Sequence, residues 1–360
     1  MPEKILFTVT TDLRHDQRMQ RIATTLAQAG CQVTLVGRKL PNSQPLPSAP
    51  YGQHRLSCVF HKGPLFYLEF NLRLFFWILR APVDILGIVD ADTALSGVLA
   101  AKVRRLKVTY DAHELFPQMP EVVNRPLVKK IWSWCERLAF KGADQTYTVS
   151  ASLAEYFQNQ YQRPVAVVRN MPFQVEMLPM PQQPPYFIYQ GALNVGRGLE
   201  CLLHALQGTE ARLMICGTGP LEQELKNLAK QLQVEDRVQF MGNVPPEQLI
   251  MLTQQAIAGI MLLEQTGLSY YYSLANKFFD YVQAGIPQVC VNFPEYRALN
   301  QVHEVALLVD LEVQQVREAL QRLLLDQPHY ARMQHACLQA RQNWNWSIES
   351  QRLLQIYAQL

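Results

Sequence analysis

Several patterns that would indicate a metal site, a nucleic-acid partner or a membrane span are missing from this sequence. No CxxC or HExxH motif occurs, so no built-in metal site is predicted. The formal net charge is only +3 and no lysine-rich or arginine-rich block appears, which argues against binding to nucleic acid. The most apolar segment, residues 65–80, contains Glu69, Asn71, Arg73 and Arg80 and falls short of the roughly 20 apolar residues that cross a bilayer.

Signals for secretion and for disulfide bonds are also missing. The N-terminus has no basic start followed by an apolar core, so no secretory signal is predicted. The cysteines are odd in number and far apart, which favours reduced core residues over a disulfide framework. They are Cys31, Cys58, Cys135, Cys201, Cys216, Cys290 and Cys337. We therefore expect a cytoplasmic protein.

The length predicts two domains. A chain of 360 residues, 49% of them apolar, is longer than one open α/β domain usually is. Its first half alternates strand-like and helix-like segments, beginning with KILFTVT at residues 4–10, a helical pattern at residues 17–29 and the strand-like QVTLVG. The loop after the first strand lacks GxGxxG, which argues against a dinucleotide site.

Polar side chains follow two later strand-like segments of this half. Asp90 and Asp92 come after one of them, and Asp111, His113 and Glu114 come after the next. Because the carboxyl ends of parallel strands meet at one edge of a sheet, we expect these side chains to form a site.

Two residues near the first loop, Asp12 and Arg18, are further candidates for that site. A purely structural alternative stays open, in which Asp111 and Glu114 cap the following helix or pair with Arg18 and Arg21.

The apolar segment at residues 65–80 has two interpretations. It covers the sheet as an amphipathic helix, or it lies in the plane of a membrane surface through Phe75, Phe76 and Trp77 with Arg73 and Arg80. The second interpretation suits a lipid-linked substrate.

A proline-rich stretch, residues 171–185, separates the two halves and has no regular periodicity, which is typical of a hinge. After it the alternation of strands and helices resumes. Gly191, Gly196 and Gly198 surround Arg197 at the start of a helix, where backbone N–H groups favour a phosphate.

A second glycine turn, Gly217 and Gly219, follows the next strand. Farther on, residues 274–284 predict a helix that ends at Gly285, before Pro287. Lys277 and Asp280 lie one turn apart on it, near the sheet edge where open α/β folds bind ligands. They would suit a diphosphate and a ribose.

Together these segments resemble the retaining, nucleotide-sugar-dependent glycosyltransferases of family four, which have the GT-B fold. The resemblance covers nearly the whole chain, and its motifs are specific through their order and spacing. They are DQRMQRIATTLAQAG, VTYDAHELF, WCERLAFKGADQTYTVSASLAEYF, VVRNMP, GALNVGRGLECLL, ICGTGPLEQEL, FMGNVPPEQL and SLANKFFDYVQAGIPQV.

The resemblance implies an α/β protein with two Rossmann-like domains whose parallel sheets face a cleft. Residues 1–172 would form the acceptor domain, 173–185 the linker and 186–346 the nucleotide-sugar domain. The last helix, residues 347–360, would pack on the first domain as in similar proteins.

It also implies roles for individual residues. His113 matches the active-site histidine near the transferred sugar, and Arg197 and Lys277 would neutralise the diphosphate. Asp280 stands where the family has the glutamate that binds the ribose, and neighbouring Asn276 is a further donor contact.

The sequence departs from the family pattern at two places. Tyr272 replaces the first glutamate of the motif, which normally contacts the donor sugar, and Ala192 replaces an arginine that many members use to hold the diphosphate. The identity of the sugar therefore stays open, as do the base, the acceptor and the oligomeric state.

The implied activity is that of a retaining, metal-independent, hexosyltransferase-like enzyme without a cofactor, which transfers a sugar from UDP or GDP to a glycan or lipid-linked glycan in polysaccharide biosynthesis. Two alternatives remain. One is a non-catalytic nucleotide-sugar-binding protein, and the other is a different enzyme with two Rossmann domains, such as an epimerase or a nicotinamide dehydrogenase.

Overall fold

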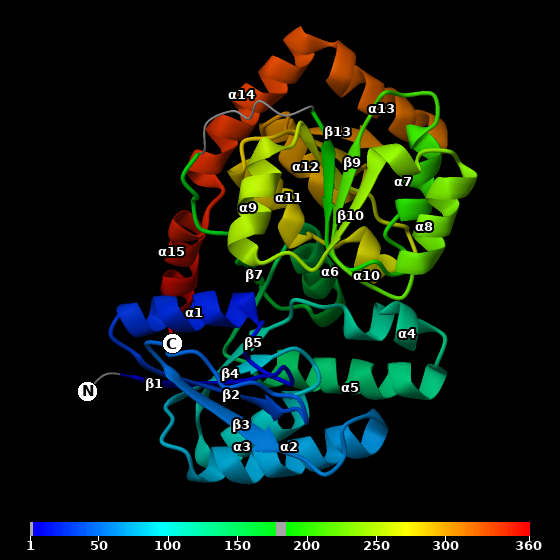
Figure 1. Cartoon of the computed structure of the whole chain (residues 1–360). Helices are drawn as coiled ribbons and strands as arrows, with labels where there is room; N and C mark the ends of the chain where they lie inside the picture. The colour runs from blue at the N-terminus through cyan, green and yellow to red at the C-terminus, as the bar shows by residue number, and fades with distance from the viewer. Residues whose placement is uncertain (1–2, 178–184) are drawn as a thin grey trace. The chain divides into compact units, whose positions relative to one another are not determined.

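The computed structural model describes residues 3–177 and 185–360, in which the chain forms two compact α/β units (Figure 1). Unit 1 contains Met1–Asn170, Gly267–Ser269 and Glu349–Leu360, and unit 2 contains Met171–Thr266 and Tyr270–Ile348. The predicted linker, residues 173–185, lies partly outside the described residues.

Unit 1 is built on a parallel sheet that has seven strands in the described part of the chain. In spatial order they are β3 (Gly52–Ser57), β2 (Gln32–Lys39), β1 (Lys4–Thr8), β4 (Ile85–Val89), β5 (Lys107–Asp111), β6 (Gln145–Thr148) and β7 (Ala166–Val167). The chain runs outward from β1 in one direction and then returns to β4 on its other side. The loops after β1 and β4 therefore flank a topological switch point, where open α/β sheets bind ligands.

The helices of unit 1 lie on both sides of this sheet, with α1 on one side and α2 and α3 on the other (Figure 1). They are α1 (Gln17–Gln28), α2 (Gly63–Arg80), α3 (Ala94–Arg104), the 3₁₀ turn η1 (Phe116–Gln118), α4 (Pro120–Val123), α5 (Pro126–Gly142), α6 (Ala151–Tyr161) and, from Glu349 on, α15 (Trp346–Tyr357). Ser150 caps α6 as a Ser side chain can, because its hydroxyl accepts a hydrogen bond from the N–H of Leu153.

The apolar segment predicted at residues 65–80 is α2, and one of its faces is core. Phe66, Phe70, Leu74 and Ile78 recur every four residues and are almost completely buried, as expected for a helix that covers a sheet. In the described residues no helix combines the length and the apolar character that a membrane span requires.

Unit 2 repeats the architecture with a parallel sheet of six strands in the described part of the chain. In spatial order they are β10 (Val238–Gly242), β9 (Leu213–Cys216), β8 (Phe187–Gln190), β11 (Ala258–Met261), β12 (Gln288–Val291) and β13 (Ala306–Val309). Its switch point lies between β8 and β11. The strands read as nearly continuous apolar runs because helices cover both faces of the sheet.

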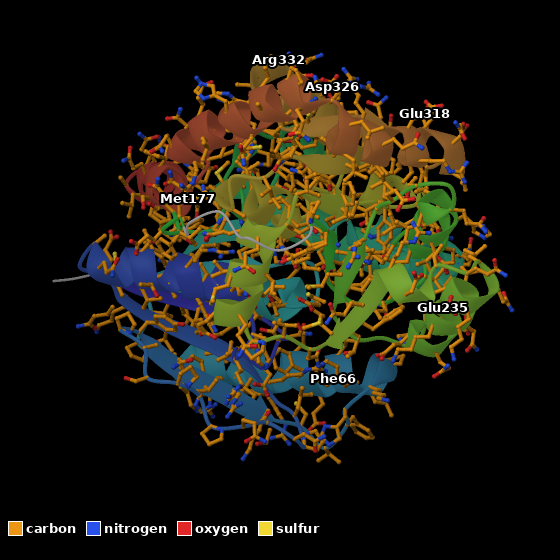
Figure 2. All side chains as sticks on the ribbon, turned by 45° about the horizontal axis from the view of Figure 1, so that its top comes forward. Phe66, Met177, Glu235, Glu318, Asp326 and Arg332 are labelled. Atoms are coloured by element: carbon orange, nitrogen blue, oxygen red, sulfur yellow. The ribbon has the colours of Figure 1, made fainter. Side chains whose placement is uncertain are left out.

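The helices of unit 2 are α7 (Leu199–Leu206), α8 (Glu222–Gln231), the 3₁₀ turn η2 (Glu235–Arg237), α9 (Pro246–Gln255), α11 (Asn276–Gln283), α12 (Pro294–Val302), α13 (Val313–Leu325) and α14 (Gln327–Asn343). The short helix α10 (Leu268–Tyr271) is divided between the two units at Ser269 and Tyr270. Most are amphipathic. On α13 and α14, for example, Glu318 and Arg332 project to the outside while Leu320 and Met333 are buried (Figure 2).

The end of the chain belongs to unit 1. The hydroxyl of Tyr357 on α15 lies 3.0 Å from Oγ1 of Thr109 and 3.5 Å from the hydroxyl of Tyr147, on β5 and β6. Glu349 accepts a hydrogen bond from the N–H of Arg169 at 2.7 Å. All seven cysteines are free thiols.

Candidate functional site

Helix α11 carries Lys277 and Asp280 and is anchored directly on the switch point of unit 2. It begins at Asn276, two residues later than the sequence pattern predicts, and Gly285 follows it in the left-handed conformation at φ +75°. The hydroxyl of Tyr281 lies 3.3 Å from the carbonyl oxygen of Ile188 and 3.1 Å from that of Ile260, in β8 and β11.

A glycine makes this anchoring possible. A Cβ atom at Gly259 in β11 would lie only 2.3 Å from the Tyr281 ring, so any larger residue would push the ring and α11 away from the sheet. The position of Lys277 and Asp280 at the carboxyl ends of β8 and β11 thus depends on the absence of a side chain in the strand below.

Lys277 is a cation that forms no ion pair with a carboxylate in the part of the chain that the structure describes. Its Nζ atom lies 4.3 Å from the centroid of the Tyr189 ring. Burial, reinforced by the charge of Arg197, lowers the pKa of Lys277 to about 7, although Asp280 favours the charged form. A bound anion would reverse this effect and restore the full positive charge.

Arg197 supplies the second cation of this cluster. Its guanidinium lies 5.6 Å from the centroid of the Tyr270 ring, and its Nε atom is buried with no hydrogen-bond acceptor in the described part of the chain. A buried N–H without an acceptor is costly, so an incoming anion would gain a contact that the protein has left open.

The glycine loops around these cations pack backbone against backbone. A Cβ atom at Gly217 would lie 1.9 Å from the carbonyl oxygen of Gly191, and one at Gly219 would lie 2.4 Å from that of Leu193. The N–H of Gly191 donates to the carbonyl of Cys216 at 2.9 Å. The loops after β8 and β9 are therefore held together.

The predicted glycines before α7 also have structural roles. Gly196 and Gly198 adopt φ values of +86° and +64°, which favour glycine. Gly198 forms the N-cap of α7 and thereby places Arg197 next to the first turn of that helix.

Asp280 is joined to the same strand through an amide. Nε2 of Gln190, the last residue of β8, donates to its Oδ2 at 3.3 Å, and Oε1 of Gln190 accepts from the hydroxyl of Thr253 at 3.1 Å. Asn276 is exposed at the start of α11, and Tyr272 is half-buried, with its ring centroid 5.4 Å from that of Tyr271.

In unit 1, Asp90 organises the loop that carries His113. Its Oδ1 atom accepts hydrogen bonds from the N–H groups of His113 and Glu114, both at 3.1 Å, and its Oδ2 atom lies 3.1 Å from Nε2 of His113. Asp90 itself has φ +55°. Burial and the carboxylates of Glu114, Asp92 and Asp111 raise its pKa well above the usual range.

Asp92 lies at the switch point of unit 1. Its Oδ2 atom accepts a hydrogen bond from the hydroxyl of Thr10 in the loop after β1, so the two loops are linked across the switch point. Its Oδ1 atom is buried without a partner among the described residues. Burial raises the pKa of Asp92 to about 7, against the effect of the Thr10 hydrogen bond.

The other predicted residues of unit 1 take different positions. Arg18 and Asp111 form a two-point ion pair, Nε to Oδ2 at 2.8 Å and Nη2 to Oδ1 at 2.9 Å, and both are nearly inaccessible to solvent. Asp12 pairs with Arg55 at 3.0 Å. The purely structural alternative, in which Asp111 pairs with Arg18, thus agrees with this ion pair. Glu114 is instead exposed, next to His113 in the sequence.

Three residues of these clusters are additional to the predicted sites. Tyr189 and Gln190 hold Lys277 and Asp280 in unit 2, and Thr10 holds Asp92 in unit 1. A signal for Gln190 exists in the sequence, because an amide at the carboxyl end of an otherwise apolar strand needs a polar partner. No signal of this kind marks Tyr189.

Two family models match adjoining parts of the chain. The model described as Glycosyltransferase Family 4 matches residues 17–171, and the model described as Glycosyl transferases group 1 matches residues 171–339. The chain belongs to the group 1 glycosyl transferases. The first model covers most of unit 1, and the second covers the glycine loops and α11.

Solved structures share the fold of this glycosyltransferase over its whole length. Sucrose-phosphate synthase from Thermosynechococcus elongatus superimposes with a TM-score of 0.80 at 16% identity, over 99% of this chain and 98% of that one. HepE from Anabaena, in complex with UDP-glucose, gives a TM-score of 0.77 at 14% identity, over 99% and 100%. At such identities the likeness establishes the GT-B fold.

A relative in sequence is the D-rhamnosyltransferase WbpZ of Pseudomonas aeruginosa, which is 39% identical over 75 residues. The match spans 21% of this chain and 19% of WbpZ, so about a fifth of each protein is compared.

Proposed function

We propose that this glycosyltransferase moves a sugar from a UDP-sugar or GDP-sugar to a hydroxyl group of a glycan or lipid-linked glycan, with retention of configuration. The observation that carries the proposal is the pair of cations, Arg197 and Lys277, which have no carboxylate partner in the described residues of unit 2 and adjoin the glycine loops. HepE, which shares the fold, is described in complex with UDP-glucose.

The chemistry of the cluster fits a departing nucleoside diphosphate. As the bond to the sugar breaks, negative charge grows on the phosphate, and cations already in place stabilise that charge more in the transition state than in the ground state. The diphosphate would lie against Arg197, Lys277 and the N–H groups of the loop at Gly196. Because two side chains supply the charge, we propose that the reaction proceeds without a divalent metal ion.

Other residues would recognise the rest of the donor. Asp280, held by Gln190, would accept hydrogen bonds from the ribose hydroxyls, and Tyr272 would lie beside the sugar in place of the glutamate usual in the family. A tyrosine offers a ring face and one hydroxyl instead of a carboxylate, so the preferred sugar would differ from that of relatives with the glutamate.

In unit 1, His113 would contact the transferred sugar, and the carboxylates of Asp90 and Asp92 would lie on the acceptor side. Retention would follow from attack on the face that the phosphate leaves, with a phosphate oxygen accepting the proton of the acceptor hydroxyl. In this scheme no protein side chain acts as the base.

The test combines donor binding with product analysis. Calorimetric titration with UDP-glucose, GDP-mannose and NAD would give specific binding for one of the sugar nucleotides and none for NAD. Slow hydrolysis of that donor without acceptor, observed by NMR as release of the α-anomer, supports a retaining enzyme. Binding without any hydrolysis or transfer would favour the non-catalytic protein, and release of the β-anomer would exclude retention.

We also propose that unit 1 meets an anionic membrane surface at the cytoplasmic side through α2. Leu65, Leu68 and Phe76 on this helix are more than half exposed, and a hollow of about 810 Å³ beside it is lined by Arg73 and Arg80, among others. Co-sedimentation with vesicles tests this. Binding to phosphatidylglycerol vesicles that is lost in Arg73→Glu/Arg80→Glu supports it, and no binding of the wild type to these vesicles would refute it.

A further inference from the structure

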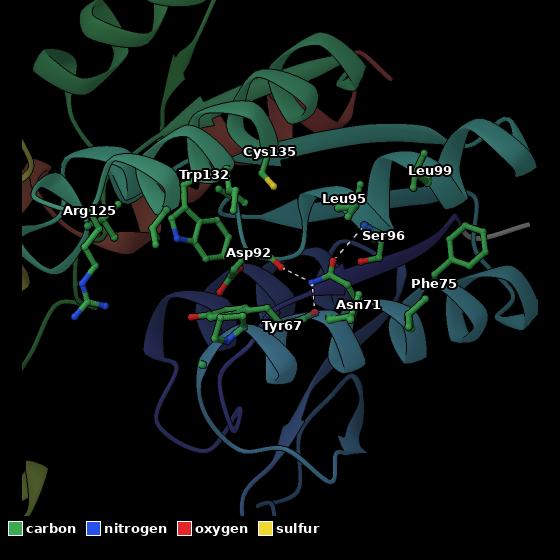
Figure 3. A pocket seen from close by; sticks show the side chains of 18 residues that line it. Tyr67, Asn71, Phe75, Asp92, Leu95, Ser96, Leu99, Arg125, Trp132 and Cys135 are labelled. Atoms are coloured by element: carbon green, nitrogen blue, oxygen red, sulfur yellow. Dashed lines mark hydrogen bonds between the residues drawn. The ribbon is translucent and has the colours of Figure 1, made fainter.

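Unit 1 contains a second feature beside α2, an apolar pocket of about 660 Å³ between α2, α3 and α5 (Figure 3). Its volume falls in the range of about 300–1,000 Å³ that is typical of small-molecule sites. Leu68 and Leu72 come from α2, Leu99 from α3, and Ile131 and Trp132 from α5. Where α2 meets α5 the rings of Tyr67 and Trp132 touch edge to face, with centroids 5.0 Å apart.

Polar groups are confined to a few places in this pocket. Asn71 is satisfied, because its Nδ2 donates to the carbonyl of Asp92 at 2.9 Å and its Oδ1 accepts from the N–H of Ser96 at 3.2 Å (Figure 3). Asp92 is different. It lines the pocket, is only 7% exposed, and its Oδ1 atom has no hydrogen-bond partner in the described part of the chain.

The position of Asp92 connects the pocket to the site. Asp92 follows β4 at the switch point, two residues after Asp90, which holds the loop of His113. The pocket therefore leads from the edge of the sheet where we place the acceptor outward between three helices.

The outer part of the pocket is open and apolar. Leu72 and Ile131 line it and are 52% and 58% exposed, and Leu68 beside them is also more than half exposed. Filling a hollow that has apolar walls and an apolar rim with a hydrocarbon removes apolar surface from water and is therefore favourable. A flat protein surface would cover the rim but would not fill the hollow between the helices.

We propose that this pocket binds the hydrocarbon chain of a lipid-linked acceptor and that the sugar end of that acceptor lies at Asp92. The proposal rests on the glycosyltransferase function proposed above. The match is one of shape and polarity, because an apolar tail with a hydroxyl-bearing head suits an apolar hollow with an unpaired carboxylate oxygen toward the sheet edge. A hydroxyl donated to Oδ1 would satisfy that oxygen.

The experiment compares two glycosides with the same head, decyl β-glucoside and methyl β-glucoside, by calorimetry below the micelle-forming concentration of the former. The wild-type protein is expected to bind the decyl compound at least tenfold more tightly. Leu72→Asp/Ile131→Asp alters two exposed side chains, so folding should survive, and it is expected to abolish the preference. Leu325→Asp, at a 79% exposed leucine of unit 2, is the matched control and should keep it.

Two results would overturn the proposal. One is equal affinity of the wild type for both glycosides, and the other is an unchanged preference in Leu72→Asp/Ile131→Asp. Asp92→Ala, checked for folding by circular dichroism, should weaken binding of both glycosides, and unchanged affinity for both would refute the placement of the sugar end.

Binding of UDP-glucose to the same variants separates this inference from the proposed function. Unchanged donor affinity in Leu72→Asp/Ile131→Asp, with the chain preference lost, supports the pocket. If the wild type prefers the decyl compound yet binds no sugar nucleotide, the pocket stands as a hydrocarbon site and the transferase function fails.

Discussion

The ammonium group of Lys277 lies 4.3 Å from the centroid of the Tyr189 ring. Its partner is thus an aromatic ring and not a carboxylate. An aromatic ring stabilises a cation without neutralising it. The charge of Lys277 is thus kept for a ligand, at the cost of a pKa lowered to about 7 by burial and by Arg197.

Replacing this lysine should remove most of the activity. We expect Lys277→Ala to lower kcat by roughly 100- to 1,000-fold, the loss typical of one charge-directed contact to a transition state. Lys226→Ala is the control, because Lys226 is 40% exposed and pairs with Glu222 on α8. A folded Lys277→Ala protein with normal turnover would contradict the assigned role.

Donor binding should depend on pH in a defined direction. Because the pKa of Lys277 in the free protein is about 7 and a diphosphate favours the charged form, a proton is taken up on binding above pH 7. UDP affinity should then fall by up to about tenfold per pH unit between pH 7.5 and 9. Calorimetry in buffers of different ionisation enthalpy measures the proton uptake, and Lys277→Arg should abolish the pH dependence.

Thermal stability should depend on pH through Asp92. Its folded-state pKa of about 7 lies above that of an unfolded aspartate, so its contribution is complete below about pH 4 and is lost as the pH rises through 7. The side chain of Asp92→Asn does not titrate. The Tm of Asp92→Asn minus the Tm of the wild type should therefore increase by several degrees between pH 4 and pH 8, because only the wild type loses stability through this group. A constant difference across this range would refute the raised pKa.

The Arg18–Asp111 pair lends itself to a double-mutant cycle. Arg18→Met or Asp111→Leu leaves one buried charge alone and should cost roughly 3–5 kcal/mol in the free energy of unfolding. The double variant should recover most of that loss, because no unpaired charge remains. Urea unfolding measures all four proteins, and strictly additive losses would show that the pair is not coupled.

The glycine loops of unit 2 predict a contrast between two substitutions. In Gly217→Ala the new Cβ atom would lie 1.9 Å from the carbonyl oxygen of Gly191, so the loops must separate, and UDP affinity should fall together with Tm. Gly208→Ala also places an alanine at positive φ, +71°, but meets no atom within 4 Å. It should cost about 1 kcal/mol of stability and leave UDP affinity unchanged. Equal effects on UDP affinity would contradict the assignment.

Much of the fold follows from local pattern. The buried strands around β1 and β4 are apolar on both faces, and α11 ends where Gly285 and Pro287 predict. The strand β3 was not predicted, because its sequence GQHRLS is mostly polar and the strand lies at the sheet edge with a single buried residue, Leu56. Pairing with β2, a long-range contact, decides its conformation.

The candidate site was predictable where residues share a loop or a helix turn. Lys277 with Asp280 and Gly196 with Gly198 are of this kind. The partners that tune them come from elsewhere in the chain, as Tyr189 does for Lys277 and Thr10 for Asp92. No periodicity in the sequence links such positions. The shifted pKa values of Lys277 and Asp92 therefore follow only from the packing in the folded structure.

The return of the chain end to unit 1 has a practical consequence. A polypeptide cut after Asn170 would leave the first half without Tyr357 and Glu349, whose partners Thr109, Tyr147 and Arg169 would then face solvent. A preparation of unit 1 alone should therefore include residues 349–360, joined through a fused linker or added as a separate peptide.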